Sequence, residues 1–104
     1  MVNPMRGEVE IVLDGTAHVA RLTLGALAEL EHDLGTDSLI GLAERFEAGG
    51  FSSRDVLAVL VAGLRGGGWR GRIDDLLSVE IGGGAVAAGR LAAELLARAF
   101  RIDA

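Results

Sequence analysis

The chain contains no cysteine, which excludes a disulfide framework and any metal site built from thiolates. It contains no lysine either, and this excludes a phosphate-binding P-loop, whose lysine contacts the phosphates. The longest apolar run, residues 56–64, is too short to cross a bilayer. The N-terminus also lacks the apolar segment of a secretory signal. We therefore expect a cytoplasmic protein that has no membrane partner.

Aromatic residues are scarce: they make up only 4% of the 104 residues, whereas 50% of the residues are apolar. The core must therefore consist of leucine, valine and alanine, a composition that suits closely packed helices. The length predicts a single domain, residues 1–104, with one modest core. The net charge of −5 and the lack of a clustered basic surface argue against a nucleic-acid partner.

A β-hairpin is predicted for residues 8–23. Val9, Ile11 and Leu13 recur at the period of two that a half-buried strand requires. Asp14-Gly15 supplies the two residues with positive φ that a type I′ turn needs, which is the strongest hairpin signal in the chain. If these two residues form the loop, the register pairs Leu13 with Thr16, Ile11 with His18 and Val9 with Ala20.

One face of this hairpin is apolar and has to be covered, because an isolated two-stranded ribbon is marginally stable in water. The residues that follow, 24–104, are predicted to be helical and can cover it. The predicted fold is therefore α+β, with an N-terminal β-hairpin packed on a small bundle of four to five helices. The apolar face comprises Val9, Ile11, Leu13, Ala20 and Leu22.

Glycines and capping residues divide the helical part into separate helices. Leucines at three- and four-residue spacing predict a first helix that Thr23 caps and Gly35 ends. A second helix ends at Gly49-Gly50. The third helix has the clearest start, with Ser52 at the N-cap and Asp55 three residues later, close to a capping box. Residues 66–72 must form a loop. A short helix at residues 74–79 or a strand at residues 76–81 follows, and a final helix covers about 85–100.

Apolar side chains surround the third helix between residues 56 and 64 instead of forming one stripe. Such a helix is either central in its own domain, the position we favour, or half-covered by a partner protein. We predict that it has apolar surface to spare and that Val56, Val59 and Leu60 bind a partner. Trp69 has two interpretations: a side chain folded over the core, or an exposed partner-binding anchor beside arginines.

Two glycine clusters match the dinucleotide-binding pattern G-x-G-x-x-G, the second with a final alanine. The cluster at Gly66 follows a helix, and the cluster at Gly82 leaves no room for another strand. Neither can belong to the βαβ unit that dinucleotide binding requires. His18 and His32, the only imidazoles, lack the spacing of a zinc motif. Because no catalytic constellation is evident, we expect a protein that is not an enzyme and that uses no cofactor or metal.

The segment from Leu22 to Gly35, LTLGALAELEHDLG, is followed by DSLIGLAERFEAGG and then by SSRDVLAVLVAGLRGGG. Over these runs, roughly residues 9–68, the chain resembles the gene transfer agent protein family, and TLGALAELE is the most specific part. The family comprises short proteins encoded among the tail genes of phage-like gene transfer agents and related prophages. It is grouped with phage tail assembly chaperones and has also been labelled a tail tube protein. It offers no catalytic residues to carry over.

The resemblance implies a tail assembly chaperone, which coats the helical tape measure protein before the tube polymerises and is then shed. This task requires a reversible apolar groove for an amphipathic helix, and often self-association. We expect the hairpin edge to be able to add a strand from a neighbouring copy.

The main alternative is a structural tail component, of the tube or minor tail, that is retained in the particle. A small enzyme, or a DNA-binding regulator with a helix-turn-helix in the second and third helices, is a more distant interpretation. The acidic charge and the absence of an arginine-rich recognition face argue against DNA binding.

Overall fold

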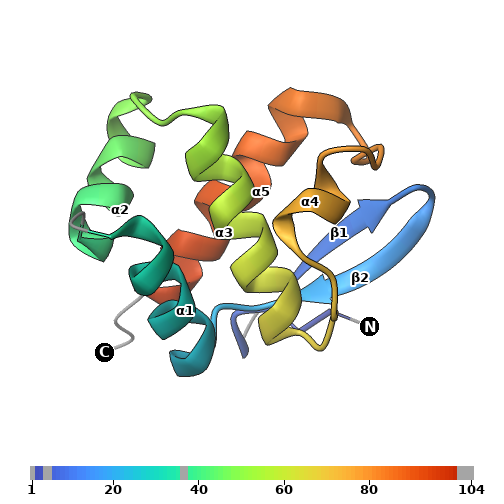
Figure 1. Ribbon diagram of the computed structural model, residues 1–104, viewed down its shortest axis with the longest axis horizontal. Coiled ribbons are helices and arrows are strands. Elements are labelled where there is room, and N and C mark those ends of the chain that lie inside the picture. Colours follow the sequence, from blue (N-terminus) through green and yellow to red (C-terminus); the bar gives the residue numbers. More distant parts are fainter. Residues whose placement is uncertain (1, 4–5, 36–37, 101–104) are drawn as a thin grey trace.

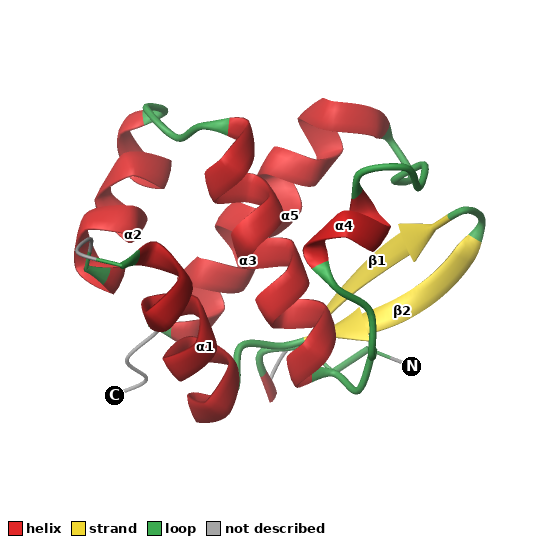
Figure 2. Cartoon of the chain, viewed as in Figure 1, coloured by secondary structure: helices red, strands yellow, loops and turns green. Residues whose placement is uncertain are grey.

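The computed structural model describes residues 2–3, 6–35 and 38–100, and it has the predicted α+β architecture. An N-terminal antiparallel hairpin packs against a bundle of helices (Figures 1 and 2). None of the helices in these ranges is long and apolar enough to span a membrane. The strands are β1 (Val9–Leu13) and β2 (Thr16–Ala20), and the helices are α1 (Leu24–Leu34), α2 (Leu39–Ala48), α3 (Ser53–Gly66), α4 (Ile73–Leu76) and α5 (Gly84–Ala99).

The hairpin has the predicted turn and register. Asp14 and Gly15 have φ angles of 49° and 82°, the left-handed conformation that a type I′ turn requires. Leu13 pairs with Thr16, and Val9 pairs with Ala20. The whole predicted apolar face is buried, with exposed fractions of 8% or less at Val9, Ile11, Leu13, Ala20 and Leu22.

The helix boundaries follow the predicted caps. The Thr23 hydroxyl accepts a hydrogen bond from the Ala26 N–H at 3.1 Å, which satisfies one free donor of the first turn of α1. At the start of α3, the Ser52 side chain accepts from the Asp55 N–H at 3.1 Å, and the Asp55 carboxylate accepts from the Ser52 N–H at 2.9 Å. Together these two bonds form the complete capping box.

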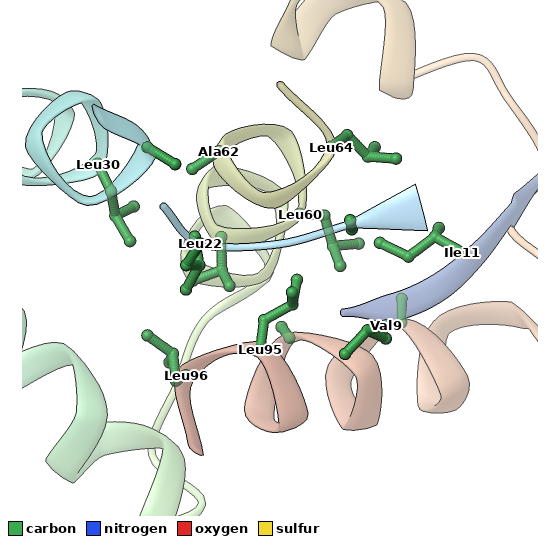
Figure 3. Packing of buried hydrophobic residues seen from close by; sticks show 14 of the residues in the cluster. Val9, Ile11, Leu22, Leu30, Leu60, Ala62, Leu64, Leu95 and Leu96 are labelled. Atoms are coloured by element: carbon green, nitrogen blue, oxygen red, sulfur yellow. The ribbon is translucent and has the colours of Figure 1, made fainter. Parts of the chain in front are cut away.

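Helix α3 lies at the centre of the fold, as favoured from its all-round apolar surface. It packs against α1, α5 and β2. Val59, Leu60 and Leu64 are fully buried, and Figure 3 shows Leu60 and Leu95 pointing into one interior together with Ile11. Much of the apolar surface that the sequence suggested was surplus is therefore enclosed within the subunit.

The two alternatives predicted here, a short helix at 74–79 and a strand at 76–81, each occur in part, because the short helix α4 is followed by a strand-like bridge at Ile81. Ile81 forms an antiparallel bridge with Leu13. The Asp14 N–H donates to the Glu80 carbonyl at 2.8 Å, and the Gly82 N–H donates to the Val12 carbonyl at 2.9 Å. This end of the outer edge of β1 is therefore occupied by the chain itself, which corrects the expectation of an open hairpin edge there.

The last turn of α3 lies against β2 at backbone-to-backbone distance. The Arg21 N–H donates to the Gly63 carbonyl at 2.8 Å. A Cβ atom on Gly66 would lie 2.0 Å from the Arg21 carbonyl oxygen, and one on Gly67 would lie 1.9 Å from the Val19 carbonyl oxygen. Only glycine fits at these two positions, so the first glycine cluster serves the packing of a helix on a strand.

An ion pair ties the last turns of α2 to the first turn of α3. The Arg45 guanidinium donates two hydrogen bonds, each 3.1 Å, to the two oxygens of the Asp55 carboxylate. Burial raises the pKa of Asp55, but the hydrogen bonds from Arg45 and Ser52 and the charge of Arg45 together lower that pKa below its ordinary value of 3.8.

We predict that Gly66→Ala lowers the free energy of unfolding by about 2 kcal/mol or more, because a methyl group cannot fit against the Arg21 carbonyl. Gly50→Ala is the matched control, since no heavy atom lies within 4 Å of the added Cβ. Chemical denaturation of the two variants measures the difference. Equal stability of both variants would contradict the close approach of α3 to β2.

We predict that Asp55→Ala lowers the free energy of unfolding by about 1–2 kcal/mol near neutral pH, because a helix cap and an ion pair are lost together. The pKa of this carboxylate is lower in the folded than in the unfolded chain. Its stabilisation is therefore complete above the unfolded-state pKa and disappears as the pH falls through the folded-state value.

The difference in stability between wild type and Asp55→Ala should therefore shrink below pH 3.8. The control is Glu31→Ala, which removes an exposed carboxylate on α1. A constant difference between wild type and Asp55→Ala down to the acid limit would rule out this linkage.

Candidate functional site

The four residues predicted to bind a partner occupy two kinds of position. Val59 and Leu60 have an exposed fraction of 0% and form the core between α3 and its neighbours. They present no surface in this subunit, because other elements of the chain cover the helix on this side. Val56 and Trp69 are half-buried, at the start of α3 and just after its end. Partner binding at these two positions stays a prediction.

Trp69 folds back onto its own chain. The backbone N–H of Trp69 donates to the Leu64 carbonyl at 2.9 Å, and the Trp69 side chain packs against the core. The ring lies over Gly71, where an added Cβ would come within 2.0 Å of the ring atom Cζ2. This arrangement agrees with the first of the two interpretations, a side chain that covers the core.

The outward face of α3 forms the floor of a groove of about 460 Å³, which we call the α3 groove. Arg54, Ala58, Val61 and Arg65 follow one another at spacings of four, three and four residues, so they share one face of the helix. Figure 1 shows α3 running between α1 and α4, which supply the two walls. The groove is lined by Glu29, Asp33, Arg54, Ala58, Val61, Ala62, Arg65, Arg72 and Ile73.

Arg65 closes one side of the α3 groove. Its guanidinium donates to the Glu29 carboxylate at 3.2 Å and to the Gly71 carbonyl at 3.2 Å, so it joins α1, α3 and the loop before α4. The charge of Arg65 is thereby paired within the subunit. Arg54 and Arg72 are exposed on the rim, and Asp33 is exposed on the α1 wall. The groove therefore combines a small apolar floor with a charged rim.

A second groove, of about 390 Å³, lies where the start of α3 meets α4 and the start of α5, and we call it the Leu77 groove. Leu77 is 66% exposed at its margin, and Val56 lies on its wall. Sequence analysis missed Leu77 because it fell in the stretch that was ambiguous between helix and strand. The groove is lined by Phe51, Ser52, Ser53, Val56, Leu57, Leu76, Leu77, Ile81, Ala85 and Ala88.

A third exposed surface, partly apolar and partly acidic, lies on the α2 side of the molecule. Phe46 stacks on Phe51 with the ring centroids 4.5 Å apart and the planes 5° apart, which joins α2 to the segment before α3. On the outer face of α2, Ile40, Glu44 and Glu47 are exposed at positions i, i+4 and i+7, and Ile40 is 70% exposed. We call these three residues the α2 stripe.

The α3 groove has the shape and chemistry for binding a helix of another protein. A shallow apolar floor with charged sides accepts the apolar face of an amphipathic helix. In the ranges that the structure describes, no three side chains of His, Asp or Glu are arranged to hold a metal ion. Gly82 in the second cluster also serves packing, since a Cβ atom there would lie 2.9 Å from the Val12 Cβ.

The chain matches a known protein family. The family described as "Phage tail tube protein, GTA-gp10" matches residues 6–102, which include the hairpin, all five helices and all three surfaces described above. The match extends beyond the region of roughly 9–68 in which the sequence runs themselves carry a resemblance. No curated protein and no solved structure matches the chain significantly.

We predict that Trp69→Ala lowers the free energy of unfolding by about 2 kcal/mol, less than the loss for a fully buried ring, because Trp69 packs on the core. Gly71→Ala should displace the ring and shift the emission maximum of this single tryptophan to longer wavelength. Arg70→Ala, an exposed neighbour, is the control for both measurements. Unchanged stability and emission in the first two variants would favour the other interpretation, an exposed anchor.

Proposed function

We propose that this protein is a structural component of a phage-like tail, because it belongs to the family of phage tail tube proteins of the GTA-gp10 type. The family match over residues 6–102 is the observation that carries the proposal. It establishes a tail-related role, and the retained structural component is the form of that role that the family description favours. The proposed role is non-enzymatic, and the proposed partners are other tail proteins, including copies of this chain.

The enclosed core supports the proposal of a component that is retained in the particle. Val59 and Leu60 are enclosed, and Glu80 and Gly82 occupy the end of β1 beside the turn. Such a fold does not need a client protein to cover its core. Part of the apolar surface that remains lies at three separate places: the α3 groove, the Leu77 groove and the α2 side. Separate contact surfaces are what a subunit with several neighbours requires.

A transient tail assembly chaperone is the second candidate, and the α3 groove is the observation that favours it. Its floor of Ala58 and Val61 between charged walls could receive the apolar face of a helical tape measure protein. The two candidates differ in one accessible property. A structural component is present in finished particles, whereas a chaperone is shed before they are complete.

The test is quantitative mass spectrometry of purified particles together with a pull-down from cells that co-express the tape measure protein. We expect this protein in the particles, in many copies relative to the tape measure protein. Its absence from particles, combined with a stable complex with the tape measure protein, would overturn the structural role in favour of the chaperone.

A pair of variants tests whether the α3 groove is needed for incorporation into particles. Ile73→Asp introduces a charge at a groove residue that is already 39% exposed, and we expect it to reduce incorporation into particles. Val86→Asp, at a residue that is 82% exposed and outside the α3 groove, is the control and should incorporate normally. Val59→Asp is unsuitable because this residue is buried, and a charge there would unfold the protein.

A further inference from the structure

We infer that the α3 groove of one copy receives the α2 stripe of a second copy of this chain. The inference rests on the proposed structural role and names one contact through which that role is carried out. It commits to a specific pair of surfaces: the groove between α1 and α4, and the exposed residues Ile40, Glu44 and Glu47.

The groove supplies a positive rim on an acidic protein. The chain has a net charge of −5, yet three of its ten arginines, at positions 54, 65 and 72, line this one groove. Arg65 is engaged by Glu29, whereas Arg54 and Arg72 are exposed on the rim. Asp33 lies on the α1 wall and repels an acidic partner, so the acidic residues of that partner should lie nearer to Arg72.

The α2 stripe has the complementary chemistry. Glu44 and Glu47 are the exposed charges of this face, and Ile40 adds an apolar side chain that is 70% exposed. The basic residue of α2, Arg45, points instead toward α3 and binds the Asp55 carboxylate. The outer face of α2 therefore presents two carboxylates and an isoleucine to a groove that offers arginines and an apolar floor.

The two surfaces lie on different parts of the subunit, and this sets the type of assembly. Figure 1 shows α2 at one margin of the molecule, while α4, which forms a wall of the groove, lies across α3 from it. When the α2 stripe of one copy occupies the groove of the next, the α2 stripe of the second copy is still free. The inferred contact, in which each groove receives the stripe of a different copy, is heterologous, and its repetition gives a ring or a filament instead of a closed pair.

Cysteine cross-linking tests this contact directly, because the chain has no cysteine of its own. Ile40→Cys on the stripe and Ile73→Cys on the groove wall both alter exposed residues, and circular dichroism verifies that each variant folds. We expect a mixture of the two single variants, oxidised at millimolar concentration, to form a cross-linked dimer. Each variant alone should give little product, and the double variant should give a ladder of oligomers.

Charge reversal provides a second test of the same contact. In the cross-linking mixture, Glu44→Arg together with Glu47→Arg on the Ile40→Cys chain should lower the yield by about tenfold or more. Adding Arg54→Glu and Arg72→Glu to the Ile73→Cys chain should restore it. Val86→Cys, an exposed residue outside both surfaces, replaces Ile73→Cys as the control for random collision.

Three results would overturn the inference. The first is a yield no higher than that of the Val86→Cys control, and the second is efficient cross-linking of Ile40→Cys to itself, which indicates an isologous contact. The third is capture of a different tail protein, instead of a second copy, by Ile73→Cys in particles. If the two cysteine variants cross-link but the protein is absent from particles, only the structural role is refuted. If the protein is present in particles but the variants do not cross-link, only this contact is refuted.

Discussion

The fold depends on the approach of the last turn of α3 to strand β2 without intervening side chains. The Gly63 carbonyl accepts the Arg21 N–H, Gly66 leaves room for the Arg21 carbonyl just after β2, and Gly67 leaves room for the Val19 carbonyl of β2. A two-stranded hairpin is marginally stable alone, so it needs a helix held at this distance. Once α3 is fixed there, its inward side chains and those of α5 cover the apolar hairpin face.

The position of α3 against β2 also determines which side of α3 faces outward and is accessible to other proteins. With Leu60 and Leu64 directed into the core, the opposite stripe from Arg54 to Arg65 faces outward between α1 and α4. Small residues on this stripe, Ala58 and Val61, make the floor shallow enough to admit a helix from outside. The same geometric constraint that stabilises the subunit thus produces the surface that we assign to assembly.

Local features of this fold could be predicted from the sequence, whereas features that join distant segments could not. The Asp14-Gly15 turn and the Ser52 cap depend on neighbouring residues, and both were predicted correctly. The bridge between Leu13 and Ile81 depends on contacts across the whole chain. Partner binding at Val59 and Leu60 was predicted from apolarity alone, which cannot distinguish the two sides of an all-apolar helix. The arginines at 54 and 65 were the available signal, since long charged side chains keep their ends in water.

The distribution of exposed apolar side chains argues for a subunit with several neighbours. Leu24, Ile40 and Leu77 are each more than 60% exposed, and they lie on or beside three different helices: α1, α2 and α4. A protein whose single task is to hold one helical client would concentrate such residues in one groove, because contiguous apolar area is what holds the client. Scattered apolar contacts instead suit a subunit that touches more than one neighbour, each through a modest area.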